Sequence, residues 1–285
     1  MKNIHVINYP IKGLCNYHCR YCFSNFRDSE PSKETALKIV EKISKFFIKS
    51  GVEHGRINLA GGEPLLYPYL NEVIDHANSL GLKVSIITNG SHLTEELVSN
   101  WQGKVEMIGI SIDAASCETN CAIGRTTHCG ESLNQEKLFH IADWIHKYGI
   151  KLKINTVISR LNLHEDTLSI YKRMKPNRLK FLCMHVLDNI NSRVNKLKPS
   201  KEEFEYFVNR NRYEGADEIV VEAENSMQNA YLMISPSGNV FLNESGESKI
   251  YGNCLEQDLY DLSGELPFDN DKYRSRYCEN GEEEQ

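Results

Sequence analysis

The chain has 285 residues, of which 40% are hydrophobic and 25% are charged, and its formal net charge at pH 7 is −6. These values are ordinary for a globular protein and exclude a fibrous or a disordered chain. No segment approaches the roughly 20 consecutive apolar residues that a membrane helix requires, and the N-terminus lacks the pattern of a signal peptide. We therefore expect a cytoplasmic protein with one large core and no membrane association.

Short apolar segments alternate with amphipathic ones along residues 1–198, which is typical of parallel strands joined by helices. The apolar segments predict six strands, near residues 5–8, 57–60, 84–88, 107–112, 152–157 and 180–185. Between them, apolar residues at helical spacing predict helices, the first of which contains Leu37, Val40, Ile43 and Phe47. The others lie near residues 68–80, 93–101, 134–148 and 163–175. Six such units are too few for a closed eight-unit barrel, so we expect an α/β fold with a partial (β/α)6 barrel.

The pattern changes after residue 199. A helix is predicted near residues 200–212, followed by short strands near 219–222, 230–234 and 239–242. The turn Ser235-Pro236-Ser237-Gly238 should join the last two strands. We therefore predict a barrel core at residues 1–198 and a C-terminal α+β extension at residues 199–285 that caps one end of the barrel.

Charge is strongly segregated along the chain. Residues 151–198 contain 11 Lys and Arg but only 3 Asp and Glu, whereas residues 199–285 contain 7 and 20. The basic segment either forms a solvated face or binds a small polyanionic ligand. Nucleic acid is a less favoured partner, because the acidic last third would repel a long phosphate backbone.

The segment with the strongest chemical signal is the run from Cys15 to Cys22, which follows the first predicted strand. Cys15, Cys19 and Cys22 can bind three corners of a four-iron, four-sulfur (4Fe-4S) cluster from one loop and leave the fourth iron without a protein ligand. A structural zinc ion would normally recruit a fourth protein ligand, and His18 lies too close in the loop to supply it. The spacing therefore predicts a cluster with one open iron, in a reducing compartment.

This spacing resembles the signature of the radical S-adenosylmethionine (SAM) superfamily. In that superfamily the open iron binds SAM, and one electron from the cluster yields a 5′-deoxyadenosyl radical that abstracts hydrogen from an unactivated carbon. The resemblance implies a 4Fe-4S cluster and SAM as cofactors, together with an external one-electron donor.

The second predicted strand is followed by Gly61-Gly62-Glu63-Pro64. The glycines allow close backbone approach, and Glu63 could face the ammonium group of SAM. Taken singly, Asn89 or Ser111 could instead cap a helix. The residues that the resemblance assigns to SAM binding are Tyr21, Phe23, Gly61, Gly62, Glu63, Asn89, Ser111 and Arg125.

Within the superfamily the chain resembles the viperins, on segments spread from residue 6 to about residue 243. The matched segments are residues 15–23, 57–64, 89–91, 123–125, 153–158, 230–232 and 241–243, with a looser match near 224–227. Viperins convert a nucleoside triphosphate, CTP in animals, to its 3′-deoxy-3′,4′-didehydro analogue, which terminates viral RNA synthesis. The resemblance implies a prokaryotic antiviral enzyme with this reaction, with CTP as first choice and UTP or GTP as possible substrates.

Cations in the basic segment are candidates for the triphosphate site. Lys153 and Asn155 alternate with apolar residues on the fifth strand, so both should point into the barrel, and Arg178 and Lys180 begin the sixth strand. A cation inside a barrel requires an anionic partner, although each of these could singly be a solvated surface residue. The resemblance adds Asn8, Arg56, where viperins have lysine, and Tyr231 as the hydrogen donor to the product, and it implies that the extension completes this site. A buried tyrosine could equally serve in packing.

Two other functions remain open at this stage. A radical SAM enzyme acting on a peptide could hold further clusters with the remaining cysteines, although ordinary thiols also explain them. These are Cys117, Cys121, Cys129, Cys183, Cys254 and Cys278. A non-enzymatic iron-sulfur nucleotide sensor would bind a nucleotide without consuming SAM.

Overall fold

The computed structural model describes residues 4–24 and 30–277 of the 285-residue chain. In this part of the chain, one sheet runs in the order β10-β9-β8-β1-β2-β3-β4-β5-β6-β7. The strands are β1 (Val6–Lys12), β2 (Arg56–Gly61), β3 (Lys83–Thr88), β4 (Met107–Ser111), β5 (Lys151–Ile158), β6 (Arg178–Cys183), β7 (Glu218–Glu222), β8 (Met233–Ile234), β9 (Asn239–Asn243) and β10 (Ser248–Asn253).

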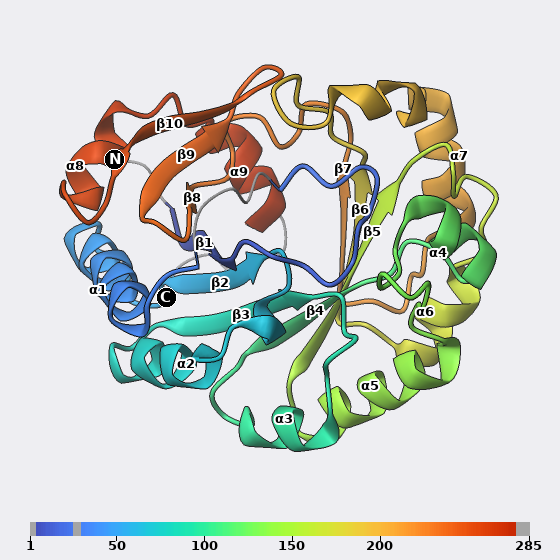
Figure 1. The fold of residues 1–285 in the computed structure, drawn as a ribbon, viewed down its shortest axis with the longest axis horizontal. Helices are drawn as coiled ribbons and strands as arrows, with labels where there is room; N and C mark the ends of the chain where they lie inside the picture. Colours follow the sequence, from blue (N-terminus) through green and yellow to red (C-terminus); the bar gives the residue numbers. More distant parts are fainter. Residues whose placement is uncertain (1–3, 25–29, 278–285) are drawn as a thin grey trace.

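Helices follow most of the parallel strands and surround them (Figure 1). They are α1 (Lys33–Lys49), α2 (Leu70–Ser79), α3 (Glu95–Asn100), α4 (Cys117–Ile123), α5 (Gln135–Lys147), α6 (Leu168–Met174), α7 (Lys201–Asn211), α8 (Leu259–Glu265) and α9 (Asn270–Tyr277), with the short 3-10 helices η1 (Pro64–Leu66) and η2 (Ser192–Leu197). No helix in the described part of the chain is both long and apolar enough to cross a membrane.

The six predicted strands are present as β1 to β6, each paired in parallel with the next. Because β10 and β7 form the two edges of the sheet, the barrel is open. The prediction of a partial (β/α)6 barrel is therefore confirmed. On the face covered by helices the strands are apolar, as buried parallel strands require, whereas their inner face also carries polar residues such as Asn8, Lys153 and Asn155.

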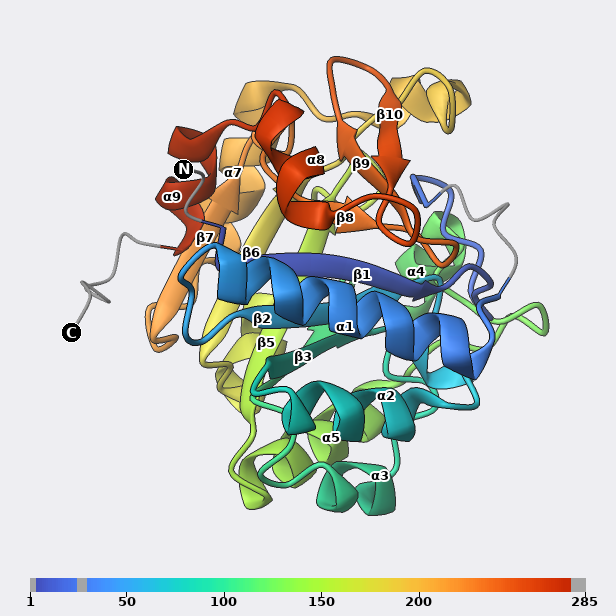
Figure 2. The same cartoon turned by 90° about the vertical axis from the view of Figure 1, so that its left-hand side faces the viewer.

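Helix α1 illustrates how the sequence forms the outer layer. Ser32 caps its N-terminus, where the side chain accepts a hydrogen bond from the Thr35 amide. Ile39, Val40 and Ile43 then recur at helical spacing and are fully buried. Each such side chain contributes about 1.5–3 kcal/mol by burial. This face packs α1 along the outside of β1 (Figure 2).

The extension joins both edges of the same sheet. β7 continues the parallel order beside β6, whereas β8 pairs with β1 on the other side and β9 is antiparallel to β8. The predicted turn is confirmed between β8 and β9, where the Ser235 amide donates to the Asn239 carbonyl over 2.8 Å. The division of the chain after residue 198 stays a prediction.

Besides the two short 3-10 helices, four elements were not predicted from the sequence: α4, β10, α8 and α9. Helix α9 lies against the start of β1, because the Tyr273 hydroxyl accepts hydrogen bonds from the amides of His5 and Val6 over 2.8 and 2.9 Å. It therefore covers the end of the barrel where the strands begin. Its apolar spacing is too irregular to predict this position from sequence.

Candidate active site

The loop after β1 carries the three predicted cluster cysteines. The residues that end α4 hold its backbone: the His18 amide donates to the Gly124 carbonyl over 3.2 Å, and the Arg20 amide donates to the Ile123 carbonyl over 2.9 Å. Cys15, Cys19 and Cys22 are all free thiols.

The environment of these thiols disfavours the free thiolate. Burial is the main cause that raises the pKa of Cys15 and that raises the pKa of Cys19 to about 12, and neighbouring cysteines contribute to both shifts. Cys15 and Cys19 therefore need a bound cation to ionise at neutral pH.

Gly61 and Gly62 bring the end of β2 against this loop. The Gly62 amide donates to the Lys12 carbonyl over 2.7 Å, and the Glu63 amide donates to the Leu14 carbonyl over 3.0 Å. A Cβ atom on Gly62 would lie 2.2 Å from the Leu14 carbonyl oxygen, and one on Gly61 would lie 2.3 Å from that of Lys12. Any side chain would push the two backbones apart, so the close approach requires glycine at both positions.

Glu63 is fully buried and joins the ends of β2 and β3. Its Oε1 accepts hydrogen bonds from the Thr88 hydroxyl over 2.5 Å and from the Leu65 amide over 3.1 Å, and its Oε2 accepts one from the Asn89 amide over 2.8 Å. Burial raises the pKa of Glu63, and these hydrogen bonds oppose that effect. Its predicted contact with the ammonium group of SAM stays a prediction.

Arg125 lies beside the cysteine loop and is buried. Its guanidinium donates to Asp113 over 2.8 Å and to the Ser111 carbonyl over 2.6 Å, and it lies 4.0 Å from the Sγ of Cys19. The Tyr21 hydroxyl donates to the same Asp113 oxygen over 2.5 Å. The fully buried Asp113 therefore holds two of the predicted SAM residues in place.

A small hollow of about 20 Å³ lies next to this group. Asn89, Ser111 and Arg125 line it together with Tyr17 from the cysteine loop. The structure thus brings three of the predicted SAM-binding residues to one place. They come from separate segments, because Asn89 follows β3, Ser111 ends β4 and Arg125 lies in the loop after α4.

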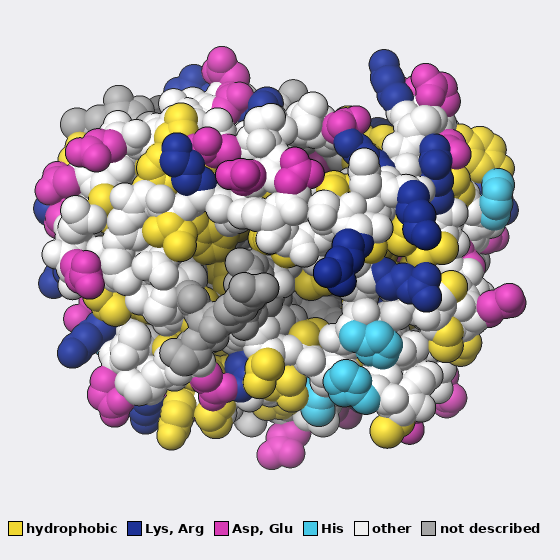
Figure 3. All heavy atoms as spheres, turned by 45° about the horizontal axis from the view of Figure 1, so that its top comes forward, with side chains coloured by type: hydrophobic (Ala, Val, Ile, Leu, Met, Phe, Trp, Pro, Cys, Tyr) yellow, Lys and Arg dark blue, Asp and Glu magenta, His cyan; other side chains and the backbone are white. Residues whose placement is uncertain are grey.

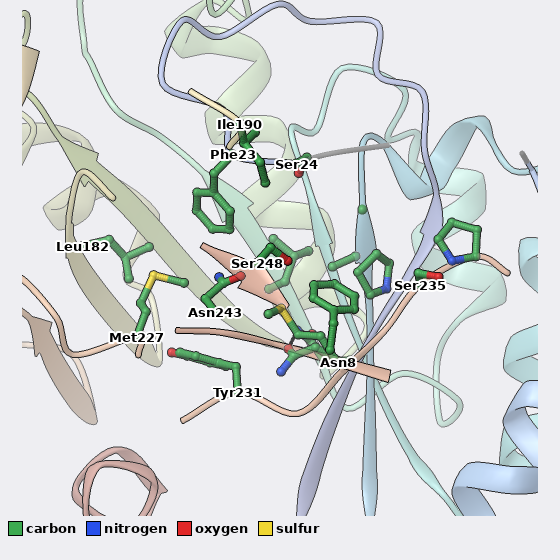
Figure 4. Close-up of a pocket in the computed structure, with 18 of the residues that line it drawn as sticks. Asn8, Phe23, Ser24, Leu182, Ile190, Met227, Tyr231, Ser235, Asn243 and Ser248 are labelled. Atoms are coloured by element: carbon green, nitrogen blue, oxygen red, sulfur yellow. Dashed lines mark hydrogen bonds between the residues drawn. The ribbon is translucent and has the colours of Figure 1, made fainter. Parts of the chain in front are cut away.

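A larger cavity of about 360 Å³ opens inside the barrel. Figure 4 shows Asn8, Phe23 and Tyr231 facing this space from different parts of the fold. The predicted site residues that line it are Asn8, Phe23, Gly61, Lys153, Asn155, Lys180 and Tyr231. Because Phe23 and Gly61 lie at or next to the cysteine loop, the cavity is adjacent to the cluster position.

Lys153 brings an amino group to the cavity wall without a direct partner. No hydrogen bond or ion pair joins its amino group to another residue in the described ranges, 4–24 and 30–277. Burial lowers the pKa of Lys153 well below 10.5, and the nearby cations Lys180 and Arg178 lower it further. The Oδ1 of Asn155 is also buried and receives no hydrogen bond from any described residue. This part of the wall therefore offers unused polar groups to a ligand.

Lys180 belongs to a second group, with Tyr231, Glu222 and Arg276. Glu222 is 2% exposed and contacts Lys180, the Tyr231 hydroxyl and, over 2.8 Å, the Nε of Arg276. Lys180 also contacts the Tyr231 hydroxyl, and the Arg276 guanidinium lies 4.4 Å from the centre of the tyrosine ring. Burial lowers the pKa of Lys180 to about 8, although Glu222 opposes the shift. The tyrosine ring and its hydroxyl are thus held by three charged side chains.

Arg56 and Arg178 do not line the cavity. Each begins its strand and forms an ion pair, Arg56 with Glu106 over 3.1 Å and Arg178 with Glu218 over 3.0 Å. Arg178 also donates to the Arg276 carbonyl over 2.8 Å. The structure therefore separates these two cations from the other predicted substrate residues, and their contact with a substrate stays a prediction.

Comparison with known families decides the class. Residues 9–174 match the family model of the radical SAM superfamily. The chain belongs to this superfamily.

Relatives narrow the family further. A protein from Flammeovirga pacifica named S-adenosylmethionine-dependent nucleotide dehydratase is 31% identical, over 95% of this chain and 93% of its own length. A protein of the same name from a Thermoplasmatales archaeon is 33% identical, over 85% of this chain and 84% of its own length. The chain therefore belongs to the family of the SAM-dependent nucleotide dehydratases. The predicted resemblance to viperins is confirmed.

A solved structure agrees on the fold. The structure described as native anSMEcpe with bound AdoMet and Kp18Cys peptide superposes with a TM-score of 0.70 and covers 95% of this chain and 82% of its own. Its sequence identity is 15%, so the likeness shows the radical SAM fold alone.

The cofactors of the radical SAM superfamily are a 4Fe-4S cluster and SAM, and the residues present fit both. Within the described residues, no three His, Cys, Asp or Glu converge on a single metal ion. A cubane does not require such convergence, because each cysteine binds a different iron. The Asn89 amide lies 3.8 Å from the Sγ of Cys15 and, like Arg125 at Cys19, offers a donor to a sulfur that would bind iron.

Sequence reasoning missed three residues of the site: Asn58, Glu222 and Arg276. The Asn58 amide donates to the Oδ1 of Asn8 over 2.7 Å and fixes its orientation. The sequence contains only a weak indication that Glu222 belongs to the site, namely that it is an acidic residue at the end of an apolar strand. Arg276 had none, because nothing in the sequence predicts that α9 turns it into the barrel.

The remaining cysteines show no common position. Cys183 and Cys254 are buried in the main apolar core, and Cys117, Cys121 and Cys129 are exposed. Cys278 lies outside the described residues. The five described thiols therefore have the settings of ordinary core and surface cysteines.

Proposed function

We propose that this radical SAM enzyme converts a nucleoside triphosphate to its 3′-deoxy-3′,4′-didehydro analogue. CTP is the first choice of substrate, and UTP or GTP would fit the same chemistry. The product lacks a 3′ hydroxyl and would terminate RNA synthesis, which gives the enzyme an antiviral role. The printed names of the relatives support the class of reaction, a SAM-dependent dehydration of a nucleotide.

The observation that carries the proposal is a lysine amino group without a direct partner in a cavity next to the cluster loop. Lys153 and Lys180 come from neighbouring strands and both line the 360 Å³ cavity. Their pKa values are lowered by burial, and Lys153 is also subject to repulsion from Lys180. A triphosphate would relieve this repulsion and supply charge-assisted hydrogen bonds. A neutral substrate would leave the charge unpaired, at a free-energy cost.

Asn8 and Asn155 are suited to orient the ribose. Asn58 fixes the side-chain amide of Asn8, and the unused Oδ1 of Asn155 can accept a hydrogen bond from a sugar hydroxyl. Both asparagines line the same cavity as the two lysines. We propose that they hold the ribose while Lys153 and Lys180 hold the phosphates.

The cluster and SAM, when bound, supply a 5′-deoxyadenosyl radical that takes the 4′ hydrogen of the ribose. The 3′ hydroxyl then leaves, and one electron and one proton complete the product and a molecule of water. We propose that Tyr231 delivers them together as a hydrogen atom, after which the external donor restores the tyrosine. The contacts with Lys180 and Glu222 support this role, because they fix the hydroxyl at the cavity wall.

Residues 199–285 would complete the site, since Tyr231, Met227 and Asn243 of the extension line the cavity. We propose that residues of the extension contact the base and so decide which nucleoside triphosphate binds.

The test is to incubate the reconstituted, reduced enzyme with SAM and each nucleoside triphosphate in turn. We expect 5′-deoxyadenosine in step with a product lighter by one water, fastest with CTP. Equal formation of 5′-deoxyadenosine with and without every triphosphate would refute the nucleotide substrate. Peptide modification would then need testing, and absence of SAM consumption under reduction would point to a sensor.

A further inference from the structure

Three exposed cations lie around the cluster loop and take no part in the site described above. They are Arg20, between two of the cluster cysteines, and Arg193 and Lys196, on the short helix η2. Among the described residues, the side chains of these three cations form no hydrogen bond or ion pair, although the backbone carbonyl of Lys196 accepts a hydrogen bond from Arg160 over 3.5 Å. They are therefore available to a partner in solution.

The fold brings η2 against the cluster loop. The side-chain amide of Asn191, just before η2, donates to the Tyr21 carbonyl over 3.1 Å. Val194 and Leu197 of η2 pack against the same small apolar cluster as Cys19 and Tyr21. Since the apolar residues of η2 face the loop, its charged residues border the loop on the outside.

About half of the other exposed cations in the described residues pair with a carboxylate, whereas the rest, such as Lys38 and Lys45 on α1, are unpaired and scattered. Lys49, Lys104 and Lys147 each pair with a carboxylate within 2.7 Å, and Arg173 pairs with Asp143 over 2.8 Å. The surface around the cluster loop differs because three unpaired cations lie there on two adjoining segments. Figure 3 shows Lys and Arg side chains close together on one side of the face that it draws. With a net charge of −6 for the chain, this local positive surface stands out in an acidic protein.

We infer that Arg20, Arg193 and Lys196 form the docking surface for an acidic one-electron carrier protein. The inference rests on membership of the radical SAM superfamily, which requires a reductant, and not on the identity of the nucleotide. Each docking event would transfer one electron from the carrier to the cluster, so the carrier is oxidised and the cluster reduced. Because electron transfer slows steeply with distance, the carrier must bind where the cluster loop meets the surface.

Electrostatics favours this surface over the rest of the protein. An acidic carrier is repelled by the overall negative charge and attracted only where positive charge is concentrated. Complementary patches of this kind raise the association rate and fix the orientation of a short-lived complex, and they do so most at low salt. Such binding suits a carrier that must arrive, transfer an electron and leave.

The test uses the holoenzyme and a flavodoxin as the acidic carrier. The variant Arg193→Glu/Lys196→Glu reverses two charges, and Arg20→Glu can be added to reverse the third. The control variant Lys38→Glu/Lys45→Glu makes the same change in net charge on exposed positions of α1. Binding of oxidised flavodoxin is measured by calorimetry at low and high salt, and cluster reduction by reduced flavodoxin is followed by its absorbance.

We expect the Arg193/Lys196 variant to lose about tenfold or more in association rate and to lose most of the salt dependence. The control variant should retain both, and reduction of the cluster by dithionite, which needs no docking, should be equal in all three proteins. Equal effects of the two variants on flavodoxin binding would overturn the inference.

Two further outcomes would also overturn it. The surface would serve the substrate instead if the variant bound flavodoxin normally but had a raised KM for the triphosphate. It would serve nucleic acid if the wild type bound a short single-stranded RNA more tightly than flavodoxin and the variant lost that binding. Neither outcome depends on whether the nucleotide product forms, so failure here is distinct from failure of the proposed reaction.

Discussion

The cluster loop and the cavity differ in whether their charged side chains have partners within the protein. Around the loop, Arg125 pairs with Asp113, and both oxygens of Glu63 accept hydrogen bonds from the protein. In the cavity, Lys153 has no such partner among the described residues. The first region is therefore organised by its own contacts before a ligand binds, whereas the second depends on the charge of its ligand.

Loss of a cluster ligand should have the largest effect. Cys19→Ser removes one of three thiolates and should abolish both the bound iron and the cleavage of SAM. Cys117→Ser, at an exposed cysteine outside the loop, is the control and should keep about four irons per chain. Iron analysis and visible absorbance measure the effect, and about eight irons in the wild type would instead reveal a second cluster.

A change in the contact between β2 and the loop should come next. Gly62→Ala would force a methyl group to within 2.2 Å of the Leu14 carbonyl oxygen. We expect a loss of about 1–3 kcal/mol in stability, as for other overpacked sites, together with poor retention of the cluster. Gly264→Ala, in helix α8, has nothing within 4 Å of the new methyl group and should lower neither stability nor cluster retention. Chemical unfolding and iron content report the two quantities separately.

Lys153 tests the charge of the cavity. Lys153→Met keeps most of the volume but removes a charged contact worth about 1.5–3 kcal/mol, so the KM for the triphosphate should rise about ten- to hundredfold. Iron content should not change, because the loop contacts are independent of this residue. Lys83→Met, at an exposed lysine on β3, serves as the control. An unchanged KM would remove Lys153 from the substrate site.

The pH dependence of binding should report on Lys180. Burial lowers its pKa to about 8, so its positive charge is present at lower pH and is lost as the pH rises through about 8. We expect triphosphate affinity to fall severalfold between about pH 7 and pH 9. Lys180→Arg stays charged over this range and should flatten the profile. A profile that is the same in both proteins would assign the titration to another group.

Arg56 should have the smallest effect of the cations predicted to bind substrate. Its guanidinium is paired with Glu106 over 3.1 Å and does not line the cavity. We expect Arg56→Gln to raise the KM for the triphosphate by no more than about two- to threefold, as for a partly exposed ion pair. A change as large as that of Lys153→Met would show that the substrate reaches the start of β2. Arg56 would then not be separate from the substrate cavity.

Much of the barrel could be predicted from sequence, because its strands and helices are encoded by local spacing. The six predicted strands match β1 to β6 to within a few residues, and Ser32 and the apolar face of α1 define that helix. The tail was harder to predict. β8 is only two residues long, and α8 and α9 have no strong apolar period, so tertiary contacts decide where they form.

The residues of the site also divide into those that local sequence predicts and those that tertiary contacts decide. Cys15, Cys19 and Cys22 lie within eight residues of one another, so one loop must bring them together. Lys153 and Asn155 share one side of a strand for an equally local reason.

Contacts between distant segments had no such signal. Glu222 and Arg276 meet Tyr231 only because β7, α9 and the segment before β8 converge inside the open barrel. The sequence by itself therefore determined the loop that carries the three cysteines, the barrel and the presence of inward cations, since each depends on neighbours along the chain. Which cations remain unpaired, which carboxylate holds the tyrosine, and which exposed charges border the cluster loop were decided only by the tertiary structure, because those contacts depend on how remote segments pack.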